Sequence, residues 1–343
     1  MNNDVTIIDV AEEADVSPAT VSRVINDTVP VNSDKERRVR EAVEKLDYQT
    51  NKFAHALRKQ QSDTVGILVP DLSNPFFATL IRGAENQIHK TEKSGLVGDA
   101  NSKTEQEGEY VDTLLREQVD GVILISSGEN SQKLKKIQDT GIPLVAADRD
   151  PNLNRVSKVL ADNYRGGVLA GNHLLDQGYE NVGFIKGPSD ISSAVARYEG
   201  FKDSFDNHKL ELDERFVFQG DFSFEGGKEA AEKLLEDVDE NCFPFGLVAA
   251  DDLMALGVMR AVENAGLNIP EDFGIIGFDN ILMAKLVNPP LTTVSIPAYQ
   301  IGEEAARILL DDIERKSEGK NSATTEQIFD VNLVVRESSK IEG

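Results

Sequence analysis

The strongest constraint on the fold is a repeated alternation of short apolar runs with longer amphipathic stretches. The apolar runs cover residues 64–70, 121–125, 143–147, 182–185, 246–250 and 273–278. Stretches with helical spacing separate them, and these include 104–118, 164–177, 225–236 and 252–265. Strands that alternate with helices imply parallel sheets that are covered by helices on both faces. Two sets of such units predict a body of two doubly wound α/β lobes.

The segment that precedes this body predicts two helices joined by a tight turn. Thr6, with an acidic residue three positions later, has the pattern of a capping box. Ser17 supplies an N-cap oxygen, and Pro18 has no N–H to satisfy in the first turn of the second helix. Asp15 lies in the turn, where a left-handed backbone is often needed. The pair is therefore a helix-turn-helix, whose second helix can lie in the major groove of DNA.

The outer face of this second helix carries side chains that suit DNA recognition. Val21 and Val24 face inward at helical spacing, whereas Thr20, Ser22 and Arg23 remain on the outside. We expect Arg23 to contact a base edge or an adjacent phosphate, and Ala19 and Thr20 to lie near thymine methyl groups. A third helix, with Ser33 and Glu36 as a second capping box, completes a three-helix head.

The runs 9–11 and 19–26 resemble the N-terminal signature of the lac-repressor (galactose-repressor) family of bacterial transcription regulators. Residues 51–58 resemble that family's hinge helix, although Thr50 and His55 replace its usual proline and arginine. The resemblance implies that the hinge folds on DNA and that Leu57 wedges between base steps in the minor groove. The DNA-contacting residues implied by head and hinge are Thr6, Ser17, Pro18, Ala19, Thr20, Ser22, Arg23, Asn26, Asn51, Ala54, His55 and Leu57.

The body resembles periplasmic sugar-binding proteins and the effector domains of the same family. Ligands of such sheets bind beyond the carboxyl ends of the strands. Carboxylates, arginines and aromatic rings that match the family's sugar-contacting positions follow the expected strands, and they suit the hydroxyls and C–H faces of a sugar. The effector-binding residues implied in this way are Asn74, Phe76, Phe77, Asp148, Arg149, Arg197, Phe222, Asp251 and Asp279.

The Asp148-Arg149 pair and the turn at residues 187–188 are most similar to the ribose repressor branch of the family. Asp251 and Ile296 depart from that branch, where Asn and Gln are usual, and the residue at position 195 is not the extra arginine of many relatives. The loss of one polar side chain from a binding site changes which hydroxyl groups of the ligand the site recognises. Ribose is therefore the first candidate effector, and another pentose or a modified sugar is the alternative.

Charge and composition limit the other kinds of protein that the chain could be. The net charge of −24 is concentrated in the body, since residues 1–61 carry a net charge of only −2. Because phosphate contacts by cations supply non-specific DNA affinity, that affinity should be weak here. A lone cysteine, Cys242, excludes an internal disulfide, and the absence of a signal peptide or a long apolar run predicts a cytoplasmic protein without membrane contact. An acidic surface of this kind suits either a salt-tolerant host or an ordinary family member that happens to be acidic.

The sequence gives little support for an enzymatic function. The pair Asp251-Asp252 has no nearby ligand at metal-binding spacing, and the chain lacks a glycine-rich phosphate loop. We therefore expect no catalytic residues, no metal and no cofactor. Two other classes are possible for such a chain, a sugar-binding protein that does not bind DNA and a global carbon regulator that responds to a phosphoprotein partner. The helix-turn-helix argues against the first, and the full set of polar pocket residues argues against the second.

Together these features predict a homodimeric repressor of sugar-metabolism genes that binds double-stranded operator DNA and a small sugar effector. The expected domains are a head at 1–50, a hinge and linker at 51–61, and a two-lobed effector and dimerisation domain at 62–343. Lobe 1 is expected at about 62–161 and 293–322, and lobe 2 at about 162–292 and 323–340. The chain's polar end has no leucine heptads, so a dimer is expected rather than a tetramer.

Overall fold

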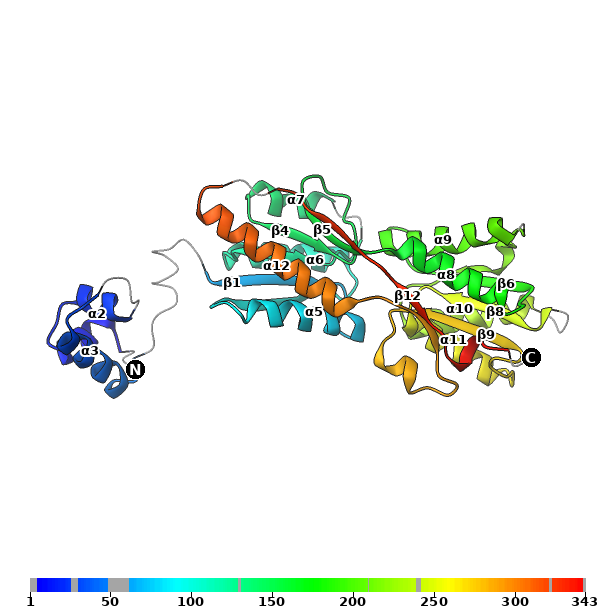
Figure 1. The fold of residues 1–343 in the computed structure, drawn as a ribbon, viewed down its shortest axis with the longest axis horizontal. Helices are drawn as coiled ribbons and strands as arrows, with labels where there is room; N and C mark the ends of the chain where they lie inside the picture. Colours follow the sequence, from blue (N-terminus) through cyan, green and yellow to red (C-terminus); the bar gives the residue numbers. More distant parts are fainter. Residues whose placement is uncertain are drawn as a thin grey trace. The chain divides into compact units, whose positions relative to one another are not determined.

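The computed structural model describes residues 5–25, 30–48, 62–128, 131–208, 210–238, 242–320 and 323–341. These residues fall into two compact units, within Met1–Ser62 and within Asp63–Gly343. The first unit is a three-helix head, and the second has two α/β lobes, each built on a six-stranded sheet (Figure 1). The predicted fold class is therefore confirmed. Among the described residues, no helix is long and apolar enough to cross a membrane.

The head contains α1 (Ile7–Glu13), α2 (Pro18–Ile25) and α3 (Ser33–Lys45). The capping box at Thr6 is present, because its side chain accepts from the Asp9 amide while the Asp9 carboxylate accepts from the Thr6 amide at 2.7 Å. Ser17 Oγ accepts from the Thr20 amide at 3.2 Å, as an N-cap does. The turn residue Asp15 has φ 51°, so the predicted left-handed turn is also confirmed.

The start of α3 differs from the expected capping box. Asn32 is the N-cap, and its Oδ1 accepts from the Asp34 amide at 3.0 Å, while Ser33 lies inside the helix. The side-chain oxygen of Asn32, one residue before Ser33, therefore caps the helix in place of the serine. The core of the head is small and aliphatic, and it consists of Val10, Ala11, Ala14, Val21, Val24, Val39 and Ala42.

Lobe 1 is a sheet in the order β11-β5-β4-β3-β1-β2, and its described pairings are all parallel. The strands are β1 (Thr64–Val69), β2 (Ser94–Asp99), β3 (Gly121–Leu124), β4 (Leu144–Ala147), β5 (Ser157–Ala161) and β11 (Glu326–Phe329). The helices are α5 (Pro75–Ile88), α6 (Thr104–Arg116), α7 (Ser131–Asp139) and α12 (Ala298–Ser317). The three central strands β1, β3 and β4 are buried and read as nearly continuous apolar runs, because helices cover both faces.

Lobe 2 is a sheet in the order β12-β10-β9-β8-β6-β7, in which only the β10–β12 pairing is antiparallel among those described. The strands are β6 (Asn181–Lys186), β7 (Val217–Gln219), β8 (Phe245–Ala249), β9 (Phe273–Phe278), β10 (Thr292–Ser295) and β12 (Asn332–Val334). The helices are α8 (Asn163–Asp176), α9 (Ser192–His208), α10 (Phe224–Asp237) and α11 (Asp252–Asn264), with short 3-10 turns η1 (Glu214–Phe216), η3 (Leu282–Lys285) and η4 (Glu337–Ser339).

The chain crosses between the lobes three times, after β5, after β10 and after β11 (Figure 1). The second and third crossings correct the expected lobe bounds. Residues 292–295 form β10 of lobe 2, although lobe 1 was expected to begin again at 293. Residues 326–329 form β11 of lobe 1, although lobe 2 was expected from 323. Both strands are short edge or near-edge strands, and neither stands out as an apolar run.

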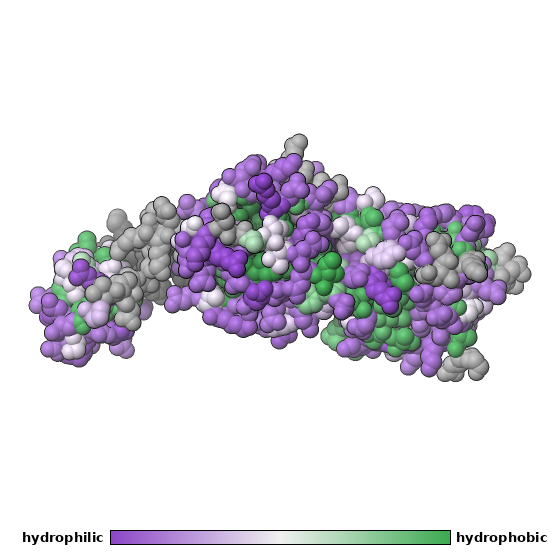
Figure 2. All heavy atoms as spheres, turned by 45° about the horizontal axis from the view of Figure 1, so that its top comes forward, coloured by the Kyte–Doolittle hydropathy of each residue, from purple (hydrophilic) through white to green (hydrophobic). Residues whose placement is uncertain are grey.

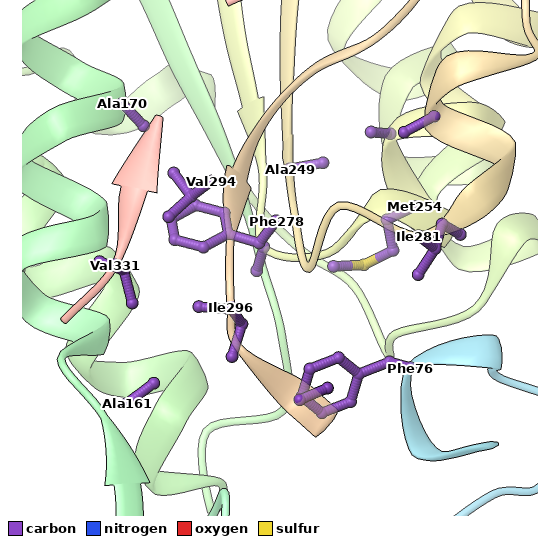
Figure 3. Close-up of a cluster of buried hydrophobic side chains, with 14 of the residues drawn as sticks. Phe76, Ala161, Ala170, Ala249, Met254, Phe278, Ile281, Val294, Ile296 and Val331 are labelled. Carbon is purple, nitrogen blue, oxygen red and sulfur yellow. The ribbon is translucent and has the colours of Figure 1, made fainter. Parts of the chain in front are cut away.

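Close helix packing and a shared apolar cluster hold the body together. A Cβ on Gly83 of α5 would lie 2.0 Å from the Tyr299 carbonyl oxygen, and one on Gly302 of α12 would lie 1.9 Å from that of Leu80. The two helices therefore touch through their backbones, which only glycine permits. At the junction of the lobes, buried side chains from α5, β9 and the second crossing pack together, among them Phe76, Phe278 and Ile296 (Figure 3).

Candidate functional site

The expected recognition helix α2 presents a polar, solvent-facing side. Ser17, Pro18, Ala19 and Arg23 are exposed, while Thr20 and Ser22 are half-buried. Thr20 Oγ1 lies 3.0 Å from Ser17 Oγ, so these two hydroxyls also hold the start of the helix. Thr6 is exposed but engaged in its capping box. The remaining predicted DNA contacts lie outside the described residues, namely Asn26, Asn51, Ala54, His55 and Leu57.

The three arginines of α3 are paired with acidic residues. Arg37 and Arg40 form ion pairs at 3.0 and 2.8 Å with the glutamates one turn away, and Arg38 Nη1 lies 3.2 Å from Asp15. Exposed pairs of this kind contribute little to stability, so a phosphate can compete for each cation. Arg23 is also exposed, and it lies on the outer side of α2.

A cavity of about 550 Å³ lies beyond the carboxyl ends of the strands of both lobes. Its volume falls in the range of small-ligand sites. Lobe 1 and lobe 2 both contribute to its wall, which is formed by Asp71, Asn74, Phe77, Asn101, Ser102, Lys103, Thr104, Glu105, Ser127, Arg149, Pro188, Asp190, Ile191, Asp221, Phe222 and Ser223. The position agrees with the rule for ligand sites in open α/β sheets.

Arg149 lies between aromatic rings of the two lobes. Its guanidinium carbon is 5.3 Å from the ring centre of Phe77 in lobe 1 and 5.4 Å from that of Phe222 in lobe 2. Its Nη1 donates to the Ser126 carbonyl at 2.9 Å, and its Nε is buried without a hydrogen-bond partner. The backbone of Phe222 is left-handed, at φ 66°. A flat ligand or a sugar face that enters this slot meets two rings and one unsatisfied donor.

Arg197 organises the wall of lobe 2 behind the cavity. It is 3% exposed, and it donates to Asn163 Oδ1 at 2.8 Å, to the Ala250 carbonyl at 2.6 Å and to Asp279 Oδ1 at 3.1 Å. Its guanidinium also lies 4.8 Å from the ring centre of Phe278. The side chain therefore links α9, where it originates, to α8 and to the ends of β8 and β9.

Three buried aspartates stand near these two arginines, and burial raises the pKa of each. Burial raises the pKa of Asp148 to about 6, although Arg149 at 3.6 Å partly opposes this. The pKa of Asp279 is also raised by burial, again against the attraction of Arg197. Burial and then the neighbouring Asp279 raise the pKa of Asp251 well above its usual value. The desolvation of a carboxylate outweighs one neighbouring cation in each case.

The paired residues Asp251 and Asp252 have different structural tasks. Asp251 is the N-cap of α11, because its Oδ1 accepts from the Met254 amide at 2.8 Å, and its Oδ2 has no partner. Asp252 accepts from the Thr293 hydroxyl at 2.6 Å and from the Ile281 amide at 2.8 Å, and burial raises its pKa as well. Asp252 thus joins α11 to β10, the strand before the second crossing. Within the described ranges no group of His, Cys, Asp and Glu could hold a metal ion.

The structure brings together most of the predicted effector residues, but at two depths. Asn74, Phe77, Arg149 and Phe222 line the cavity directly. The other predicted polar residues, Asp148, Arg197, Asp251 and Asp279, are buried behind its wall. Phe76 is 3% exposed and packs in the junction cluster, with its ring edge-on to Phe77 at 5.2 Å (Figure 3). Asn74 is also the N-cap of α5.

Ser127, Glu107 and Asn163 are among the polar residues of the site that the sequence did not predict. Ser127 lines the cavity after β3, and Glu107 of α6 lies 1% exposed behind it. Asn163 at the start of α8 is the acceptor for Arg197 Nε. Ser127 follows a predicted strand, so the rule used for Asp148 would have found it. Nothing in the pattern of α6 or α8 distinguishes Glu107 or Asn163 from solvent-facing polar residues.

Comparison with known proteins gives consistent matches over nearly the whole chain. Residues 6–51 match the model of bacterial regulatory proteins of the lacI family, and residues 172–339 match that of the periplasmic binding protein-like domain. A ribose operon repressor from Halalkalibacterium halodurans is 36% identical over 98% of this chain and 97% of its own length. Catabolite control protein A from Priestia megaterium is 34% identical over 89% of this chain and 91% of its own length.

Solved structures agree with these relatives. A lac repressor dimer bound to operator and the anti-inducer ONPF is 25% identical, with a TM-score of 0.86 over 99% of this chain and 100% of that chain. A LacI family transcriptional regulator from Enterococcus faecium with bound ribose is 32% identical, with a TM-score of 0.72 over 81% of this chain and 98% of that chain. Relatives with different names thus stand at similar identity, and the ribose branch is not singled out.

Proposed function

Because this chain belongs to the lacI family of bacterial regulatory proteins, and is a DNA-binding transcription regulator rather than an enzyme, we propose that it is a homodimeric repressor controlled by a small sugar. The head reads a pseudo-palindromic operator, and the sugar binds in the cavity between the lobes. Effector binding changes the geometry of the lobes and so biases the hinge; this coupling is reciprocal by thermodynamic necessity.

The carrying observation is the cavity at the strand ends, with its mixture of aromatic and unsatisfied polar groups. Phe77 and Phe222 supply two faces of the cavity, and at or behind its wall Arg149 Nε, Asp148 Oδ1 and Asp251 Oδ2 are buried without a hydrogen-bond partner among the described residues. A sugar brings hydroxyl donors for the carboxylates and an acceptor for the arginine. Arg197 and Asn163 then act by holding Asp279 in place rather than by lining the cavity.

Ribose is the first effector to test, since a similar repressor is named for the ribose operon and a similar structure holds ribose. A thermal-shift screen of ribose, other pentoses, hexoses and purines on the full chain identifies the ligand, because ligands stabilise the folded state. Calorimetry of the hit on the wild type and on Asp279→Ala follows. A ligand whose affinity survives Asp279→Ala unchanged contradicts the assignment of the cavity.

The operator side of the proposal depends on Arg23 and on Leu57, the expected minor-groove wedge. Leu57→Ala should weaken binding to a bent operator while the melting temperature of the free protein stays unchanged, because the expected hinge forms on DNA. Loss of several degrees of melting temperature, with normal operator binding, would make Leu57 a core residue instead.

Dimer formation is proposed through lobe 2, which exposes apolar side chains. Leu282 and Leu286 of the η3 region are 64% and 72% exposed, and a hollow of mixed character, lined by Leu256, Met259 and Val287 together with Arg260 and Glu263, lies in the same part of the lobe. Apolar surface gathers on lobe 2 in Figure 2. A large exposed apolar area marks an interaction site. Leu286→Asp should convert the dimer to a monomer in analytical ultracentrifugation, whereas Leu210→Asp, also exposed, should not.

A regulator that answers a phosphoprotein partner is the second candidate, favoured by the similarity to catabolite control protein A. Under this alternative no sugar stabilises the chain, and a partner is retained in a pull-down from lysate only when it is phosphorylated. A sugar that both stabilises the chain and releases it from operator DNA decides for the first proposal.

A further inference from the structure

Three charged side chains meet where the chain enters the sheet of lobe 1. Lys93 Nζ lies 2.5 Å from Asp120 Oδ2 and 3.4 Å from Asp63 Oδ1. The side chains of Lys93 and Asp120 are only 14% and 4% exposed, whereas that of Asp63 is 36% exposed. One ammonium group therefore holds two carboxylates together in this triad, the β1 clamp.

The sheet order explains why the β1 clamp surrounds the first strand. Asp63, Lys93 and Asp120 stand directly before β1, β2 and β3, and β1 lies between the other two strands. A contact from Lys93 to Asp120 therefore crosses the amino end of β1, over two strand spacings or about 9–10 Å. The lysine side chain thus lies across the point at which the chain enters the sheet.

The backbone at this point is held on both sides. The Ser94 amide donates to the Asp63 carbonyl at 2.9 Å, and the Asp120 amide donates to the Thr64 carbonyl at 2.8 Å. Asp63 has φ 52°, a left-handed conformation that a residue other than glycine adopts at some cost. A left-handed residue turns the chain sharply, so Asp63 sets the direction from which the preceding segment reaches β1.

That preceding segment leads from the DNA-binding head through the expected hinge at 51–61. A chain that leaves its last anchor in one direction loses less conformational entropy on DNA than one that leaves in many. Without the ammonium group of Lys93, the two carboxylates would repel each other, and the more exposed Asp63 is the one free to move. The pair with Asp120 lies inside the edge of the sheet, whereas the pair with Asp63 acts on the segment that enters it.

We propose that the β1 clamp is a positioning device for operator binding, in which Lys93 holds Asp63 in the direction that the hinge requires when the head is on DNA. The inference rests on the proposed function, because it takes operator binding to be coupled to the body through the segment before β1. Lys93 is a positioning residue, since it acts through Asp63 rather than by contact with DNA or effector.

The test is an anisotropy titration of the full chain with a labelled duplex that the wild type has selected from a random-sequence library. Asp63→Asn is the main variant, because asparagine tolerates the left-handed backbone and the pair of Lys93 with Asp120 remains. It should weaken binding about fivefold for each chain that contacts the duplex, as the loss of one partly exposed ion pair does. Asp112→Asn is the matched control, since its pair with Lys136, at 3.0 Å, joins α6 to α7 of the same lobe.

Lys93 is tested by a double-mutant cycle and a rescue. Lys93→Met should weaken the selected duplex at least as much as Asp63→Asn, and the double variant should lose no more than Lys93→Met, because residues that act as a pair are not additive. Lys93→Arg keeps a cation between the carboxylates and should retain the affinity of the wild type. Since Lys93→Met leaves Asp120 buried without its cation, urea unfolding checks that each variant is folded.

Hydrogen exchange of the free protein separates positioning from a general loss of stability. In Asp63→Asn the peptide that contains the Ser94 amide should exchange faster, because the acceptor of that amide is the Asp63 carbonyl. Peptides of lobe 2 should exchange as in the wild type.

The outcomes separate this inference from the function on which it rests. Unchanged affinity in Asp63→Asn, an equal loss in Asp112→Asn, or additive losses in the double variant overturns the inference and leaves the repressor function standing. A wild-type chain that selects no duplex from the library overturns both.

Discussion

Replacing Arg197 by methionine should destabilise the body more than any other single change to an arginine of the cavity region. The substitution keeps much of the aliphatic volume but removes three donors from acceptors on Asn163, Ala250 and Asp279. The pair with Asp279 is deeply buried, since its side chains are 4% and 6% exposed. Removing one partner of such a pair leaves an uncompensated charge, and the cost is about 3–5 kcal/mol.

The assay is urea unfolding followed by far-UV circular dichroism, because the chain contains no tryptophan. Lys136→Met is the control: its ion pair with Asp112, at 3.0 Å, has both side chains 53% exposed, and its loss should cost less than about 1 kcal/mol. Adding Asp279→Asn to Arg197→Met should recover most of the loss, because the stranded charge is removed as well. An Arg197→Met variant no less stable than Lys136→Met would refute the account of a buried charge network.

Three further outcomes follow from the structure. Arg23→Ala should lose about 1–3 kcal/mol of operator affinity in anisotropy titrations, and an unchanged affinity would remove α2 from the DNA interface. Asp148 has a folded pKa of about 6, above its ordinary value of 3.8, so the folded state favours its protonated form. Stability should therefore fall by about 3 kcal/mol as pH rises from about 4 to 6, and Asp148→Asn should remove that part of the fall in urea midpoints measured across this range. Gly302→Ala should cost about 1–3 kcal/mol, because its Cβ would meet the Leu80 carbonyl at 1.9 Å; an unchanged melting temperature would show that α5 and α12 separate freely.

The sequence predicts the head and the central strands well because local signals agree with tertiary structure there. Thr6, Ser17 and Pro18 mark the helix starts that form, and the apolar runs 64–70 and 273–278 differ little from β1 and β9. Central strands are buried on both faces, so their composition alone reveals them.

The same sequence patterns do not predict the edge strands or how deeply a side chain is buried. β10 and β11 are short, and a strand such as Glu326–Phe329, exposed on one side, carries few apolar residues. The cavity predictions find the right strand ends, yet strand-end position does not tell whether a side chain faces the ligand space, as for Asn74, or supports it from behind, as for Arg197. Glu107 escapes prediction because its task depends on a loop distant in sequence.

The three crossings between the lobes also bear on how the protein emerges from the ribosome. Lobe 1 begins at residue 64 but lacks α12 and its edge strand β11 until residue 329 has been made, whereas most of lobe 2 lies between. During synthesis, the face of lobe 1 that carries α5 therefore stays uncovered while lobe 2 is being completed. A nascent chain arrested near residue 290 should expose that face to chaperones and proteases, and translation of a few dozen further residues should close it.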